Sequence, residues 1–101
     1  MRINTRQKGR RNEFRCAKML EDVGYEVQLA PNPTRWSTQN DLFGLWDVVC
    51  VREKEIRWIQ VKTNRKPTQS ELEPYRAWRC YGSKEIWIFY DGEKEPSIMI
   101  L

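Results

Sequence analysis

The sequence predicts an α/β domain in which a mixed β-sheet is flanked by helices, in the order α-β-β-β-α-β-β. Three observations carry this prediction. Residues 7–23 show the apolar spacing of an amphipathic helix. Residues 46–63 contain two β-rich segments joined by a polar turn, which is typical of an antiparallel hairpin. Residues 68–90 contain a helix-capping pattern and then an apolar strand. A chain of this length suits one domain, so we expect residues 1–101 to fold as a single unit.

The first helix carries different side chains on different faces. Residues 1–6 are expected to form a flexible basic arm, and the helix to run to Val23 and stop at Gly24. Glu13 falls within the apolar face by its spacing. The other members of that face are Cys16, Ala17, Leu20 and Val23. A basic stripe on another side consists of Lys8, Arg11, Arg15 and Lys18.

The remaining elements follow from strand and turn signals. Strands are expected at residues 25–30, 46–51 and 57–63, with a long loop at 31–43. Later elements are a helix ending at Gly82 and strands at residues 85–90 and 97–101.

The second helix has two candidate N-caps. Thr68 with Glu71, and Ser70 with Glu73, both match the capping-box pattern. Pro74 favours Ser70, because proline is best tolerated in the first turn of a helix.

The positive charge is concentrated at the N-terminal end of the chain. Residues 1–18 contain seven Lys or Arg and one acid, whereas the remaining residues carry 11 basic and 13 acidic groups. This asymmetry favours a polyanionic partner, most simply nucleic acid. A solvated helix face that keeps the protein soluble is the alternative.

Composition excludes several classes of function. Histidine is absent, which excludes histidine acid–base chemistry, His-ligated zinc sites and the Ser-His triad. Cys16, Cys50 and Cys80 are odd in number and form no CxxC, so we expect buried thiols in a reducing cytoplasm. No apolar run approaches membrane-spanning length, and no secretory signal is recognisable, so no membrane partner is expected.

Four polar residues stand where apolar residues belong. Glu13 lies in the apolar arc of the first helix, and Asp47 interrupts a strand that reads as buried. Gln60 and Lys62 alternate with Ile59 and Val61, so they share one face of the next strand. Buried charges are costly unless they are paired or bind a metal. With the first helix covering that face, the four side chains would surround one small volume and form a site.

The chemistry of this set fits a hard cation and a phosphate. Asp47 and Glu13 would supply anionic oxygens to Mg²⁺, and Gln60 and the Val61 carbonyl would supply neutral ones. Mn²⁺ in place of Mg²⁺ is left open. Lys62 would orient the attacking water or offset charge on phosphorus. Taken singly, each residue also has an ordinary structural role: Glu13 could pair with Arg10, Asp47 could cap a turn, and Lys62 could reach solvent.

These residues carry a resemblance to a known family. A Glu on a helix, an Asp at the head of a strand and a D/E/Q-x-K strand resemble the PD-(D/E)XK nuclease superfamily. The run from Lys8 to Phe14, Lys-Gly-Arg-Arg-Asn-Glu-Phe, is similar to the opening of archaeal-type Holliday junction resolvases. The resemblance covers roughly residues 6–90 and implies a restriction-endonuclease-like core.

The resemblance also implies roles for individual residues. Glu13, Asp47 and Gln60 would be metal ligands, Lys62 the catalytic lysine, and Ser37 the loop serine that affects cleavage, with Thr34 and Thr38 as rivals. Two positions depart from the family pattern. Trp46 replaces the usual proline, and Gln60 replaces the usual second acid, which removes a negative charge. Asp41 could compensate, although a turn or N-cap role is the simpler interpretation.

The function expected from these observations is metal-dependent cleavage of DNA. The favoured activity is a homodimeric Holliday junction resolvase of the cytoplasm, whose dimer buries an apolar patch such as strand 85–90 or the second helix. The compact size and Gln60 would fit a protein encoded by a phage or virus. A nicking or repair endonuclease on duplex DNA and an inactive nucleic-acid-binding module are the alternatives. Trp36 could stack on a base or anchor its loop. The residues expected to contact DNA are Lys8, Arg10, Arg11, Arg15, Lys18, Arg35, Trp36, Arg65 and Lys66.

Overall fold

The structure, a computed structural model, describes residues 5–31 and 41–101. The elements follow the predicted order. They are α1 (Thr5–Asp22), β1 (Glu26–Leu29), β2 (Val48–Arg52), β3 (Glu55–Thr63), α2 (Gln69–Ala77), β4 (Ser83–Phe89) and β5 (Ser97–Ile100). Because α1 begins at Thr5, the predicted arm is shorter than residues 1–6, and its residues 1–4 lie outside the described part.

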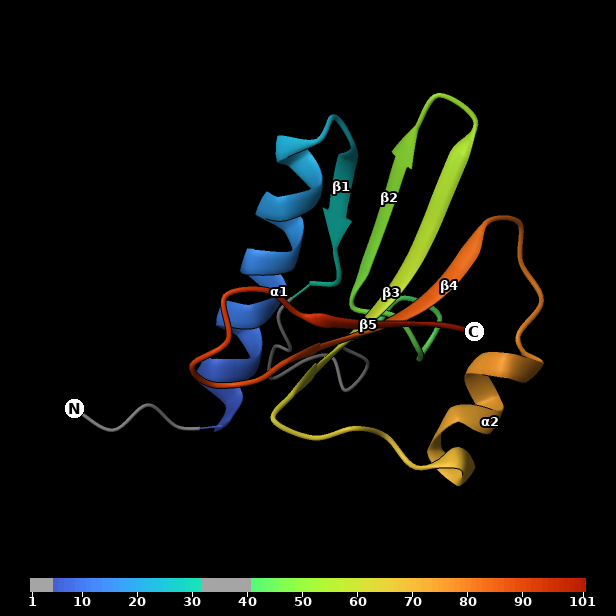
Figure 1. The fold of residues 1–101 in the computed structure, drawn as a ribbon. Helices are drawn as coiled ribbons and strands as arrows, with labels where there is room; N and C mark the ends of the chain where they lie inside the picture. Colours follow the sequence, from blue (N-terminus) through green and yellow to red (C-terminus); the bar gives the residue numbers. More distant parts are fainter. Residues whose placement is uncertain (1–4, 32–40) are drawn as a thin grey trace.

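The five strands form one mixed sheet in the order β1-β2-β3-β4-β5. β3 and β4 run parallel, and the other neighbouring strands are antiparallel. α2 lies in the connection between β3 and β4, because two parallel strands need a crossover (Figure 1). The predicted hairpin is confirmed, and Glu53 adopts a positive φ of 52° at its turn.

The two helices pack on opposite faces of this sheet (Figure 1). α1 inserts Cys16 and Leu20 into a cluster that includes Ile59 and Val61. Leu72 of α2 packs against Ile86 and Ile88 on the other face. Side chains alternate along a strand, so Gln60 and Lys62 point away from α1. The expectation that the first helix covers their face is therefore wrong. The apolar side of α1 packs instead on the apolar side of β3.

The C-terminal end of α1 differs from its predicted end. Val23 is 57% exposed, so it does not belong to the apolar face, whereas Cys16, Ala17 and Leu20 are buried. The helix closes through Gly24, whose φ is 96°, a conformation that glycine adopts without strain. The Tyr25 N–H then donates to the Leu20 carbonyl at 3.1 Å, and the Tyr25 ring enters the core.

α2 begins and ends earlier than the sequence suggested. Thr68, not Ser70, is the N-cap: its hydroxyl accepts from the Glu71 N–H, and the Glu71 carboxylate accepts from the Thr68 N–H. Pro74 therefore lies inside the helix. The helix ends at Ala77 rather than near Gly82.

A lysine explains the early end of α2. The Lys84 ammonium donates to the carbonyls of Tyr75, Arg76 and Trp78 at 2.7, 2.8 and 2.9 Å. A cation at this position satisfies carbonyls that have no partner inside the helix.

The tryptophans and cysteines divide between the core and partly exposed positions. Trp46 and Trp87 are buried, as expected, but Trp58 and Trp78 are only half-buried. Trp46, Trp58 and Trp78 form an aromatic cluster with Phe43 and Tyr75. Cys16 and Cys50 are buried, whereas Cys80 follows α2 and is half-buried.

Strand 85–90 is mostly interior, so it is not the exposed apolar patch expected for a dimer; β4 lies between β3 and β5. Within the part of the chain that the structure describes, no helix is long and apolar enough to span a bilayer.

Candidate active site

Asp47 is held at the head of β2 by the backbone of β3. Its N–H donates to the Ile59 carbonyl at 3.0 Å, and its Oδ2 accepts from the Val61 N–H at 2.9 Å. Val48, the next residue, pairs with Ile59, and one end of the Gln60 amide lies 3.2 Å from Asp47 Oδ2. The side chain is buried, and burial, followed by the negative charge of Glu13, raises the pKa of Asp47 to about 8. Such a carboxylate favours a proton or a cation beside it.

The Gln60 amide lies directly against this carboxylate. One end of the amide is 2.5 Å from the Leu45 carbonyl oxygen and 3.2 Å from Asp47 Oδ2. With its nitrogen at that end, Gln60 donates to both oxygens. With its oxygen at that end, three oxygens face one another, and either a proton on Asp47 or a cation between them would relieve the repulsion. The side chain can therefore serve Asp47 as a hydrogen-bond donor or join it as a metal ligand.

Glu13 approaches Asp47 from α1, although α1 covers the face of the sheet opposite to the one that carries Gln60 and Lys62. Its Oε1 is 2.9 Å from Arg10 Nη1, and the same nitrogen donates to the Ala30 carbonyl at 2.9 Å. The Ala30 N–H in turn donates to the Asp47 carbonyl at 2.8 Å, which links α1 to the head of β2. Burial raises the pKa of Glu13, and the Arg10 guanidinium opposes that rise.

Lys62 follows Gln60 on the same face of β3 and is half-buried. Its ammonium makes no hydrogen bond or ion pair with the residues that the structure describes. The Val61 N–H points toward Asp47, and because the N–H and C=O of a strand residue point to the same edge, its carbonyl does so too. The D/E/Q-x-K strand thus brings an amide and a carbonyl to the Asp47 carboxylate, and it carries on the same face a lysine that has no partner among the described residues.

Asp41 also lies at this site, although a turn or N-cap role was the simpler expectation for it from the sequence. Its carboxyl is within hydrogen-bonding reach of the Asp47 carboxyl. A possible sequence signal was an acid six residues before the motif Asp, across a Gly-containing turn. Across residues 5–31 and 41–101, no three Asp, Glu, Cys or His side chains are placed to hold a metal ion by themselves. A metal site here would therefore need the Gln60 amide or backbone carbonyls.

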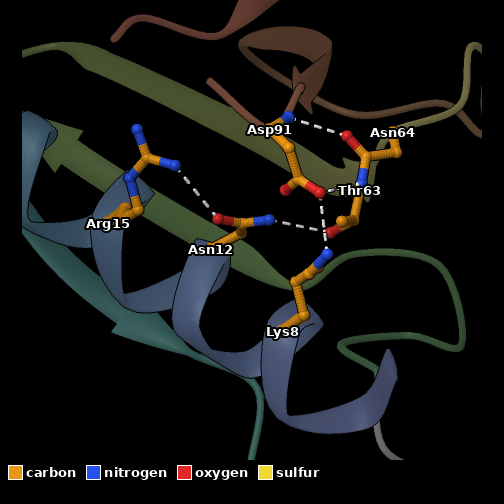
Figure 2. A network of polar contacts seen from close by, with 6 residues as sticks. All are labelled: Lys8, Asn12, Arg15, Thr63, Asn64 and Asp91. Carbon is orange, nitrogen blue, oxygen red and sulfur yellow. Dashed lines mark hydrogen bonds and ion pairs between the residues drawn. The ribbon is translucent and has the colours of Figure 1, made fainter. Parts of the chain in front are cut away.

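Two cations of the predicted basic stripe are engaged within the fold (Figure 2). Lys8 Nζ lies 2.8 Å from Asp91 Oδ2, which also accepts from Asn64 Nδ2 at 2.9 Å. Arg15 Nη1 donates to Asn12 Oδ1 at 3.2 Å. These contacts connect α1 to the turn after β4.

The same network fixes the end of β3, directly after Lys62. Buried Asn12 donates from Nδ2 to Thr63 Oγ1 at 2.9 Å, and Asn64 Oδ1 accepts from the Asp91 N–H at 2.7 Å (Figure 2). The strand that carries Gln60 and Lys62 is therefore anchored to α1, which carries Glu13.

The other predicted DNA contacts occupy varied positions. Arg11 and Lys66 are exposed and have no partner among the described residues. Lys18 is 3.5 Å from Asp22, and Arg65 makes a two-pronged ion pair with Glu71. Loop residues Thr34, Arg35, Trp36, Ser37 and Thr38 lie outside the described residues.

Comparison with known proteins identifies the fold. The structure is similar to Hjc, a Holliday junction resolvase from Archaeoglobus fulgidus, with a TM-score of 0.63. The match covers 89% of this chain and 73% of that chain, at 14% sequence identity. The chain therefore has the restriction-endonuclease-like α/β fold that was predicted. No protein-family model and no curated protein matches the sequence.

Proposed function

We propose that this protein is a metal-dependent DNA endonuclease. The observation that carries the proposal is the placement of Asp47: its carboxylate is buried, accepts from the Val61 N–H and lies against the Gln60 amide. The strand that carries Gln60 also carries Lys62, whose ammonium has no partner among the described residues. The fold supports it, because the same arrangement of elements occurs in a Holliday junction resolvase. Fold alone does not define an activity, so the argument rests on the site.

The residues fit a hard divalent cation. Asp47, Glu13, the Gln60 amide oxygen and the Val61 carbonyl are oxygen donors of the kind that Mg²⁺ or Mn²⁺ takes. The Gln60 amide lies against Asp47 Oδ2 and the Leu45 carbonyl, so its oxygen would join these two as a ligand if a cation were bound. When bound, such an ion polarises a phosphoryl group and lowers the pKa of a water molecule.

The side chains of the chain itself would perform the other tasks. Lys62 would donate to a phosphate oxygen or orient the attacking water, since its ammonium has no partner among the described residues. Arg10 would hold Glu13 toward the site through their ion pair, rather than contact DNA as predicted from the sequence. Exposed Arg11 and Lys66 are the cations best placed to bind phosphates.

A four-way DNA junction is the proposed substrate, and a homodimer the proposed assembly, since symmetric incisions need two sites. The excess of cations at the N-terminal end and the resemblance of residues 8–14 to archaeal-type resolvases support this choice. Gln60 favours one alternative, an inactive DNA-binding module, because a neutral amide weakens the negative field that attracts a cation. A nicking or repair endonuclease on duplex DNA is the alternative that retains metal-dependent cleavage of DNA and changes only the substrate.

Cleavage of an immobile four-way junction beside a linear duplex of the same sequence tests this proposal. Both DNAs are incubated with Mg²⁺, with Mn²⁺ and with EDTA. We expect paired symmetric cuts in the junction alone and only with metal. Equal cutting of both DNAs would leave a nuclease but not a resolvase. Tight junction binding without cutting in either metal would contradict the enzyme and leave the binding module.

A further inference from the structure

A short turn brings Asp41 beside Asp47. Leu42 and Trp46 form an antiparallel bridge, with N–H to carbonyl distances of 2.6 and 3.0 Å in the two directions. Phe43 and Gly44 have φ values of 55° and 72°, which allow the chain to reverse within a few residues. In an antiparallel pair the next residues outward face each other, so residues 41 and 47 are neighbours across the turn.

The turn uses the backbone of Asp41: the Gly44 N–H donates to the Asp41 carbonyl at 3.2 Å. Among the described residues, none donates a hydrogen bond to the Asp41 carboxylate. That side chain lies within hydrogen-bonding reach of the Asp47 carboxyl. Two carboxylates in contact repel each other unless a proton or a cation lies between them.

A buried amide lies at the same place and brings a third kind of polar group to it. The Gln60 side chain is 9% exposed, and one end of its amide faces both Asp47 Oδ2 and the carbonyl of Leu45. Leu45 belongs to the same turn as Asp41. Carboxyl, carbonyl and amide groups therefore converge from the turn and from β3.

We propose that Asp41 supplies the carboxylate that Gln60 lacks, so that Asp41, Asp47 and the Gln60 amide oxygen together hold the divalent cation of the active site. The inference rests on the proposed metal-dependent function and names a ligand for it. It accounts for the neutral residue at position 60: the second acid has been transferred from β3 to the turn that precedes β2. The site then has as many carboxylates as it would have with an acid at position 60, and Glu13 adds another from α1.

The test is Mn²⁺ binding to the full chain without DNA, measured by the electron paramagnetic resonance signal of free Mn²⁺. We expect Asp41→Asn to weaken Mn²⁺ binding about tenfold or more. Asp22→Asn is the matched control, because Asp22 is exposed at the far end of α1, and it should bind as the unmodified protein does. Near-UV circular dichroism verifies folding, and Asp41→Ser replaces Asp41→Asn if the latter does not fold.

A rescue variant separates a ligand from a structural residue. Gln60→Glu should tighten Mn²⁺ binding, and the double variant Asp41→Asn with Gln60→Glu should return close to the unmodified affinity. Unchanged binding in Asp41→Asn, no recovery in the double variant, or no Mn²⁺ binding by the unmodified protein at millimolar concentration would each overturn the inference. Mn²⁺ binding that behaves as expected in a protein that cuts no DNA would support Asp41 as a ligand and remove only the endonuclease proposal.

Discussion

The Asp47 carboxylate lies where its protonated form is favoured. It is buried beside Glu13, and these effects raise its pKa to about 8, while the hydrogen bond from the Val61 N–H opposes the rise. In the unfolded chain the pKa is near 3.8, so the folded protein binds more protons between these two values. The contribution of Asp47 to the stability of the metal-free protein should therefore fall as pH rises from about 4 to about 8, and then become constant.

Asp47→Asn should remove this pH dependence. The amide has nearly the same shape, keeps an oxygen for the Val61 N–H and carries no charge. We expect the variant to be more stable than the unmodified protein at pH 8.5 in EDTA, by roughly 1–3 kcal/mol, and similar to it near pH 4.5. Urea unfolding at both pH values measures the difference, with exposed Asp22→Asn as control. Equal stability at pH 8.5 would show that the site does not oppose ionisation of Asp47.

At the scale of elements, the anchoring of α1 determines the geometry of the site. The Asn12–Thr63 and Lys8–Asp91 contacts hold α1 against the end of β3 and the turn after β4. They explain why part of the basic stripe is not free for phosphates. The partners lie more than 50 residues apart in the chain, so helical periodicity alone could not predict them.

α2 offers a direct test of its N-terminus. Thr68→Ala removes the hydroxyl that accepts from the Glu71 N–H, so it should lower the free energy of unfolding by about 1 kcal/mol. Ser70→Ala, the matched control at the cap favoured by the sequence, should change it by less than about 0.5 kcal/mol. Both are measured by urea unfolding at neutral pH. The reverse order of effects would place the cap at Ser70.

For the whole molecule, local sequence signals predicted more than long-range packing did. The order of elements, the β2–β3 hairpin and the shared face of Gln60 and Lys62 follow from turn residues and strand alternation. The face covered by α1 was predicted wrongly. An inward-pointing Glu13 suggests that α1 packs on the polar side of β3, the side of Gln60 and Lys62. The helix instead uses the apolar side, and Glu13 reaches Asp47 past the end of β1, through Arg10 and Ala30.

The position of Asp41 could not be predicted from local sequence signals either. Its approach to Asp47 depends on a bridge between Leu42 and Trp46 that requires a positive φ at Phe43, a conformation that the sequence does not announce at a non-glycine residue. The Ser70 prediction is wrong for a related reason. Both candidate caps match the capping box, so only the preference of proline for the first turn favours Ser70, and the packing of α2 on β4 tolerates Pro74 within the helix.

Lys62→Ala is the sharpest test of the proposal that this fold carries a working nuclease site on β3. The rate of junction cleavage in Mg²⁺ at saturating protein is compared with that of Lys66→Ala, which removes an exposed lysine four residues further along the chain. We predict that Lys62→Ala lowers the cleavage rate by about 100-fold or more with junction binding retained, whereas Lys66→Ala weakens binding and leaves the saturated rate unchanged. Equal cleavage rates in the two variants would contradict the proposed site.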